Sequence, residues 1–384
     1  GRYVNDGVKA DIGFTAKFGI TPTITLDFAY NPDFAQVEAD APVTAANQRF
    51  PIFYPEKRPF FLERIDMFQS PLELVNTRSI VDPDIAAKLT GRRGKNTFGV
   101  IYASDKAPGN FGKDDRETYL LCSSQYQADP NRNCPAGRLI DKNADIGVFR
   151  FKRDIGSESN IGLFSTTYNF VDHHNHTGGF DGRLRLDKKT VFEFQAVGTH
   201  TRGFFYDPDR DDSFYRTGNG VGYSAWMERG GRNFYMNFLL TGKSPNYRAD
   251  VGFTDRTDTN ENGMFMRYRT DPKPKSAIVS KQIAFFSNIE YDWSGRTQHR
   301  ITEIRGSLNL QKNSNITVTL QQGYERVFEH EFGPRRRAGQ LGAFFGPSSE
   351  RSASLKAIQI RASSTPLKQL SFNLFLDNTW GEIG

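Results

Sequence analysis

The sequence lacks the long apolar runs and the strong charge excess that mark two common classes of protein. No stretch approaches the ~18 consecutive apolar residues that a membrane-spanning helix requires, so a helical membrane protein is excluded. The 50 Lys and Arg residues stand against 44 Asp and Glu residues, and the net charge of +6 is too mild for a dedicated nucleic-acid binder. The chain begins with glycine rather than methionine, so we expect any secretion signal to lie upstream.

Cysteine is also scarce, with only two residues in the 384-residue chain. Cys122 and Cys134 are twelve positions apart in a polar stretch without histidine, and a zinc site would need more ligands. In an oxidising compartment this spacing suits a loop-closing disulfide, whereas a reducing one would leave two free thiols. Both alternatives stay open at this point.

Aromatic residues and glycine are abundant, at 13 % of the chain and 35 residues respectively, and the apolar residues recur with a period of two. Such alternation is typical of β-strands with two unlike faces. It is clearest in five sets of alternate positions: 24, 26, 28 and 30; 234, 236, 238 and 240; 304, 306, 308 and 310; 316, 318 and 320; and 370, 372, 374 and 376.

The alternating segments are about nine to twelve residues long, which favours a membrane barrel over a soluble sandwich. Strands of soluble proteins cluster near five or six residues, whereas a tilted strand needs about nine to eleven to cross a bilayer. The positions between the apolar ones carry Thr, Asn, Gln, Arg and Asp, as a water-facing lumen requires. In the alternative, a soluble sandwich, these polar residues face bulk solvent.

Connections of alternating length support the barrel, because outer-membrane barrels pair short periplasmic turns with long external loops. Short turns are expected near residues 19–22, 94, 156, 188, 230, 272, 313 and 366. Long connections are expected at 31–84, 104–143, 170–178, 201–219, 242–262, 293–299 and 328–352.

We therefore predict an all-β fold, a large antiparallel transmembrane β-barrel with about sixteen strands in residues 1–384. The first and last strands would both have their chain ends on the long-loop side. Since bacterial barrels usually keep both termini in the periplasm, we expect at least one further strand upstream and one downstream, giving eighteen or more.

The segment from Asn31 to Glu63 has the most distinctive sequence, with the motifs NPDF (31–34), QVEAD (36–40) and PEKRPFFLE (55–63). It resembles the hallmark of an uncharacterised bacterial outer-membrane barrel family, a domain of unknown function that commonly follows a periplasmic family-9-like carbohydrate-binding module. Supporting matches are GVKADIGF near the start, AAKLTGRRG at 86–94 and ADVGFTDRTD at 249–258. The motif residues are Asn31, Pro32, Asp33, Phe34, Glu38, Asp40, Pro55, Glu56, Lys57, Arg58, Pro59, Phe60, Phe61 and Glu63.

The resemblance implies a barrel in the outer membrane of a Gram-negative bacterium, and no settled activity. Its implied partners are the lipid bilayer and lipopolysaccharide, with a periplasmic carbohydrate-binding module or associated subunits as further partners. No nucleic acid is expected. The module itself is missing from these residues, so a sugar-related role is not claimed.

Residues 31–84 cannot form a regular lipid-facing strand. Their prolines lack the backbone N–H groups that hydrogen-bond neighbouring strands, and their adjacent charges would be costly in hydrocarbon. We expect a long insertion folded into the lumen, with its aromatic residues on the wall and its charges paired, which would narrow a bore wide enough to conduct water. The alternative is a surface loop that braces the rim.

Metal-binding candidates are weak. His173, His174 and His176 offer imidazoles, but polar histidines are ordinary in a loop. Asp207, Asp209 and Asp211 resemble the start of a calcium loop, but Asp212 stands in place of the sharp-turn glycine and Gly218 in place of the final glutamate. We expect no metal and no cofactor.

A basic cluster at residues 335–337 fits lipopolysaccharide phosphates, anionic solutes or a plain solubilising loop. No nucleophile elbow, phosphate-binding glycine loop or zinc-peptidase motif occurs, so no catalytic residue is assigned and the chain is not expected to be an enzyme. The leading hypothesis is a channel or transporter with a constricted lumen. The alternatives are a non-conducting scaffold for a periplasmic binding domain or larger assembly, and a barrel enzyme acting on lipid or glycan.

Overall fold

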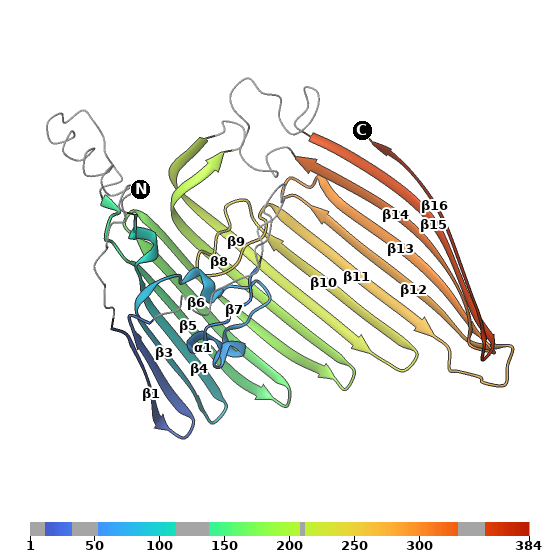
Figure 1. Cartoon of the computed structure of the whole chain (residues 1–384), viewed down its shortest axis with the longest axis horizontal. Helices are drawn as coiled ribbons and strands as arrows, with labels where there is room; N and C mark the ends of the chain where they lie inside the picture. The colour runs from blue at the N-terminus through green and yellow to red at the C-terminus, as the bar shows by residue number, and fades with distance from the viewer. Residues whose placement is uncertain (1–11, 33–52, 113–137, 208–211, 329–349, 384) are drawn as a thin grey trace, which may run out of the picture.

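The computed structural model describes residues 12–32, 53–112, 138–207, 212–328 and 350–383. In these residues sixteen antiparallel strands form one sheet, in which each strand pairs with its neighbours in the sequence (Figure 1). The predicted fold class, all-β with sixteen antiparallel strands, is confirmed. No pairing joins β1 to β16 within the described residues, and the described sheet is open. The strands are β1 (Phe14–Thr21), β2 (Ile24–Tyr30), β3 (Pro83–Arg93), β4 (Asn96–Asp105), β5 (Ala144–Gly156), β6 (Ser159–Phe170), β7 (His173–Asp187), β8 (Thr190–Asp207), β9 (Asp212–Gly230), β10 (Phe234–Lys243), β11 (Thr259–Arg269), β12 (Ile278–Tyr291), β13 (Thr297–Leu310), β14 (Ser314–Phe328), β15 (Glu350–Leu367) and β16 (Leu370–Ile383).

Helical structure in the described residues is limited to single turns. These are α1 (Pro59–Leu62) and the 3₁₀ turns η2 (Ile65–Phe68), η3 (Thr77–Ser79) and η4 (Ala107–Gly109). None of the helices found there has the length and apolar character needed to cross a membrane.

The short turns lie at one edge of the sheet, close to the positions that the sequence predicts (Figure 1). The turn between β13 and β14 shows why they are tight. Lys312 and Asn313 adopt positive φ angles of 57° and 49°, the left-handed conformation that suits the twist of a hairpin.

Two of the expected long loops are mostly strand. Only Val171 and Asp172 separate β6 from β7, so the expected loop at 170–178 is wrong. The expected loop at 201–219 is wrong over most of its length, because β8 continues to Asp207 and β9 starts at Asp212. Their glycine and polar residues have loop composition, but cross-strand pairing overrides this local preference.

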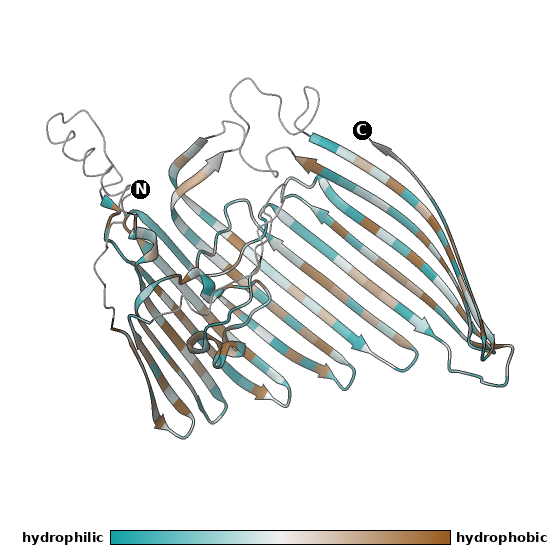
Figure 2. Ribbon diagram, in the orientation of Figure 1, coloured by the Kyte–Doolittle hydropathy of each residue, from teal (hydrophilic) through white to brown (hydrophobic). Residues whose placement is uncertain are grey.

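Hydrophobic and hydrophilic residues alternate along many of the strands (Figure 2), and the pairing register places the two kinds on opposite faces of the sheet. On one face, which we call the outer face, Leu320 lies directly between Ile304 and Ile358 of the neighbouring strands, and about half of its surface is exposed. All three residues in the adjacent row on the opposite, inner face are polar, with Thr319 between Arg305 and Gln359. The outer face carries exposed large side chains from many strands, among them Phe18, Leu163, Phe180, Val221, Phe234, Ile283, Ile316, Phe372 and Leu374.

All sixteen described strands belong to this one sheet, and the outer apolar rows meet no second sheet among the described residues. The sandwich alternative therefore does not hold for this part of the chain. The five sets of alternating apolar positions singled out in the sequence all lie on the outer face.

The inner face is mainly polar over β10 to β16 but apolar over part of β2 to β8. The buried core there combines small and aliphatic strand residues with side chains from two connecting segments. The strand contribution comes from Ala29, Ala86, Ile101, Ala103, Ala144, Ile146, Val148, Phe164 and Val197. The prediction of a polar inner face is thus wrong for these strands, because other parts of the chain cover them.

Candidate functional site

A segment that precedes β3 lies on the inner face of the sheet (Figure 1). We call residues 53–82 the first inner segment. Its Phe61, Phe68, Leu72, Leu74 and Ile80 are buried in the core described above. Two direct contacts fix its position: the Leu72 amide donates to Gln195 Oε1 of β8 at 2.9 Å, and Lys88 Nζ of β3 donates to the Phe60 carbonyl at 2.5 Å.

A buried ion pair holds the first inner segment together. The Arg58 side chain is fully buried, and its Nε and Nη2 donate to the two carboxylate oxygens of Glu56 at 2.9 and 2.8 Å. Nη1 and Nη2 also donate to the carbonyls of Ile80 and Thr77, at 2.6 and 2.7 Å. The guanidinium lies 4.4 Å from the ring centroid of Phe61. Arg58 therefore ties the PEKRPFFLE motif to the chain about twenty residues further on.

Glu56 is ionised in this arrangement. Burial by itself raises the pKa of Glu56, but the hydrogen bonds from Arg58 and Thr77 and the positive charge of Arg58 outweigh it and lower the pKa to about 2. The Thr77 hydroxyl donates to Glu56 Oε2 at 2.6 Å. The pair is consequently a charged one at neutral pH.

A second buried charge joins the segment to the wall. Lys88, which is 1 % exposed, also donates to the Glu63 carbonyl at 3.0 Å and lies 3.5 Å from Asp27 of β2. The Glu63 side chain pairs with Lys17 of β1. These contacts explain why three of the charged residues stand among the aromatic ones in the motif: Arg58 pairs with Glu56 within the segment, and Glu63 pairs with Lys17 of the wall.

The connection between β10 and β11 forms a second inner segment, residues 244–258, which is hydrogen-bonded to the first. The Asn76 amide donates to the Val251 carbonyl at 2.8 Å, and the Phe253 amide donates to the Glu73 carbonyl at 2.9 Å. An added Cβ at Gly220 of β9 would lie 2.4 Å from Tyr247 Cα, so glycine permits the close approach of this segment. The ADVGFTDRTD motif is thus placed against the first inner segment.

A polar cluster anchors the second inner segment near the long-loop edge. His173 Nε2 of β7 and Asp250 Oδ2 are 2.5 Å apart, and Arg248 Nε donates to Asp250 Oδ1 at 2.8 Å. Burial raises the pKa of Asp250, but the hydrogen bond with His173 and the charge of Arg248 reverse this and leave the pKa lowered. Asn175 bonds the same segment through the Arg248 carbonyl and the Asp250 amide, at 2.8 and 3.1 Å.

The histidines singled out in the sequence do not converge. They lie in β7 rather than in a loop, with His173 on the inner face and His174 and His176 on the outer one. His174 contacts Asn169 and His176 contacts Thr167. No group of three or more His, Cys, Asp or Glu residues with metal-binding geometry occurs in the part of the chain that the structure describes.

Some of the other sequence candidates lie in the described parts of the chain, and the rest lie outside them. Asn31 begins the connection after β2, where its amide donates to the Asp84 carbonyl at 2.7 Å, and Pro32 follows it. Pro55, Lys57 and Pro59 belong to the first inner segment, and Pro59 is the first residue of α1. Asp207 ends β8. The following candidates lie outside the described residues: Asp33, Phe34, Glu38, Asp40, Cys122, Cys134, Asp209, Asp211 and the arginines at 335–337.

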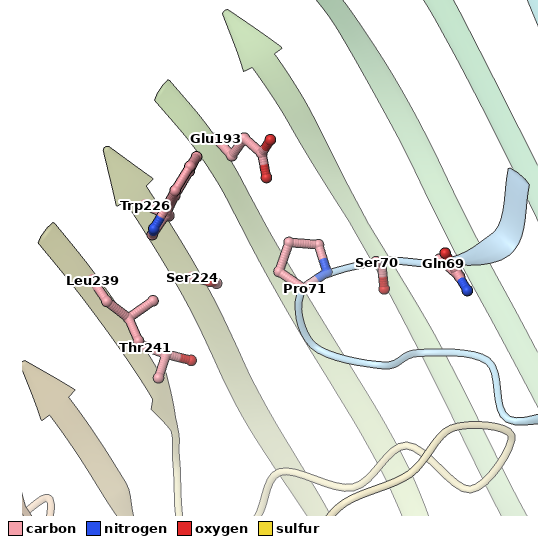
Figure 3. A pocket seen from close by; sticks show the side chains of 8 residues that line it. All are labelled: Gln69, Ser70, Pro71, Glu193, Ser224, Trp226, Leu239 and Thr241. Atoms are coloured by element: carbon pink, nitrogen blue, oxygen red, sulfur yellow. The ribbon is translucent and has the colours of Figure 1, made fainter. Parts of the chain in front are cut away.

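A groove opens between the first inner segment and the neighbouring wall (Figure 3). Its volume is about 510 Å³. Gln69, Ser70 and Pro71 form one side, and Glu193, Ser224, Trp226, Leu239 and Thr241 of β8, β9 and β10 form the other. Sequence alternation alone does not reveal this groove, because the groove depends on where the segment lies on the sheet.

A substitution at Gly99 of β4 tests how closely the first inner segment packs against the sheet. An added Cβ would lie 2.0 Å from Met67 Cε and 2.6 Å from Phe68 Cζ. We therefore expect Gly99→Ala to lower the free energy of unfolding by about 1–3 kcal/mol, as overpacking does. Gly263→Ala is the matched control, because the nearest atom to its Cβ is Leu239 Cβ at 3.4 Å. Denaturant unfolding measures both, and equal stability of the two variants would contradict the described packing.

A family model described as a domain of unknown function (DUF5916) matches residues 4–82. The match contains the NPDF, QVEAD and PEKRPFFLE motifs, and it says nothing about a carbohydrate-binding module. A search of curated proteins gave no match. Among solved structures, the crystal structure of Acinetobacter baumannii OccAB3 is similar over 98 % of this chain and 90 % of that chain, with 10 % identity and a TM-score of 0.19. Agreement at that level carries no argument about this protein.

Proposed function

We propose that the chain forms the wall of an outer-membrane channel, a β-barrel partly filled by the two inner segments. The observation that supports the proposal best is the outer face, which presents aliphatic and aromatic side chains in register across the sheet and is covered by no other described element. Exposed apolar surface of this extent marks an interaction site, and hydrocarbon chains fit a surface that extends across the sheet.

The strand order supports closure into a barrel. In lipid every backbone N–H and C=O group needs a partner, which only helices and closed barrels provide. An up-and-down antiparallel sheet satisfies all its strands except at its two edges, here β1 and β16. The proposal therefore includes pairing of these edges in the membrane.

The inner segments divide the proposed bore into two regions. The core beneath them involves β2 to β8, whereas the inner face of β11 to β16 is lined mainly by polar side chains. Barrels of sixteen or more strands leave an aqueous channel unless something fills them. We assign the open path to the side of β11 to β16, with the first inner segment as its constriction.

Current across a planar bilayer tests this proposal. The purified protein, refolded into the bilayer, is expected to give discrete conductance steps in potassium chloride, and heat-denatured protein gives none. Folded protein that inserts but passes neither ions nor small solutes would contradict the channel and favour a sealed scaffold.

A further inference from the structure

Four arginines gather on the inner face of the strands that the core leaves uncovered. Arg267 of β11 and Arg305 of β13 flank Ala284 in one transverse row. Arg269 and Arg361 belong to the next row towards the short turns, which runs through Gln282, Ser307 and Thr317. Because neighbouring strands lie ~4.8 Å apart, the Cα atoms of Arg267 and Arg305, two strands apart, are separated by only ~10 Å. We call Arg267, Arg269, Arg305 and Arg361 the arginine band.

The arginine band has few acidic partners, unlike the charges in and beneath the first inner segment. There Arg58 pairs with Glu56, Lys88 with Asp27, and Arg150 with Asp181 at 2.5 Å. In the band only Arg305 pairs with a carboxylate, Glu303, at 2.5 Å. No carboxylate in the described parts of the chain pairs with Arg267, Arg269 or Arg361.

Aromatic rings support two of these guanidinium groups without neutralising them. Arg267 lies 5.5 Å from the ring centroid of Tyr235, and Arg361 lies 4.9 Å from that of Phe375. Stacking of this kind restricts a guanidinium plane while leaving its N–H groups free to donate. The arrangement is suited to recognition of an anion.

A groove of about 710 Å³ lies against one part of the band, and its lining includes Arg305 and Arg361 but neither Arg267 nor Arg269. Arg305 and Arg361 line it together with the neutral hydrogen-bonding side chains of Ser307, Asn315, Thr319 and Gln359. Planar guanidinium forks match the oxygen atoms of phosphate and carboxylate groups, and hydroxyl and amide groups donate the remaining hydrogen bonds.

We propose that the arginine band is a binding site for small oxyanions, solutes that carry phosphate or carboxylate groups, and that it makes the passage selective for anions. The selectivity rests on the proposed channel function, whereas the binding does not. Positive charge along a confined groove raises the local concentration of anions, and the effect is strongest at low ionic strength.

Reversal potentials in a potassium chloride gradient test the selectivity. The native protein is expected to pass chloride in preference to potassium, and the triple variant Arg267→Gln, Arg305→Gln, Arg361→Gln is expected to lower that permeability ratio several-fold. The control variant Lys273→Gln, Lys312→Gln, Lys368→Gln removes three charges at exposed short turns and should leave the ratio unchanged. A native channel without anion preference, or a ratio unchanged in the arginine variant, overturns the proposal.

Calorimetric titration of the detergent-solubilised protein with inorganic phosphate, and separately with citrate, tests the binding without requiring current. Binding of either probe that is lost in the glutamine variant supports the site, and the tighter probe identifies the preferred head group. Substitution of the same three arginines by lysine keeps the charge and is expected to weaken binding at least several-fold, because the forks are lost. Absence of binding to both probes overturns the site. A protein that binds but carries no current instead contradicts only the channel.

Discussion

The substitution Leu320→Arg is expected to lower the free energy of unfolding of the membrane-inserted protein by about 2–4 kcal/mol. This is the cost of a cationic side chain on the lipid face near the middle of a barrel strand. Leu320 lies seven positions from the short turn in β14, between Ile304 and Ile358. The arginine side chain of this variant would have no carboxylate on the neighbouring residues, Ile304 and Ile358. Guanidinium-induced unfolding from phospholipid vesicles measures the effect.

The neighbouring inner position gives the control. Gln321 follows Leu320 in the strand and faces inward, opposite Glu303. Gln321→Arg adds the same side chain beside a carboxylate and is expected to be tolerated, with less than ~1 kcal/mol of change. If the two substitutions cost the same, the outer face is not the lipid face.

Loss of the Arg58 guanidinium is expected to have the second large effect. Arg58→Met keeps the length of the side chain but leaves the Glu56 carboxylate and the Thr77 and Ile80 carbonyls without their buried donor. Breaking a buried ion pair from one side costs about 3–5 kcal/mol. We expect the first inner segment to leave the wall, which would increase proteolytic cleavage within residues 53–82 and enlarge the conductance.

Lys57 provides the control for Arg58, because it is the adjacent basic residue and is exposed. Lys57→Met should change neither cleavage nor conductance. Adding Glu56→Gln to Arg58→Met removes the stranded charge and should recover part of the stability. Equal behaviour of the Arg58 and Lys57 variants would show that the ion pair does not hold the segment.

Local patterns predict the wall of this fold well. Alternation such as Ile316, Val318 and Leu320 against Thr317 and Thr319 specifies both the strand and its faces, because the side-chain period of two leaves no other register. Glycine, proline and lysine mark the short turns for an equally local reason. Composition gave a wrong prediction at His173, where a loop was expected, because strand pairing extends through residues that are typical of loops.

Contacts between distant parts of the chain could not be predicted in this way. The hydrogen bonds between residues 73–76 and 251–253 join segments more than 170 positions apart. The burial of Arg58 depends on the return of the chain at Thr77 and Ile80. The arginine band requires the register of β11 to β15, since Arg267, Arg305 and Arg361 are unremarkable in their own strands.

Accessibility of consecutive spin labels along β14 is the measurement that tests the central claim most directly. Single cysteines at positions 316 to 321, in a background without Cys122 and Cys134, would carry nitroxide labels in reconstituted vesicles. We predict that oxygen, which partitions into lipid, relaxes the labels at 316, 318 and 320 most strongly, and that a water-soluble nickel chelate favours 317, 319 and 321. Equal exposure of both sets to the nickel chelate would contradict a lipid-facing outer surface, and with it the barrel.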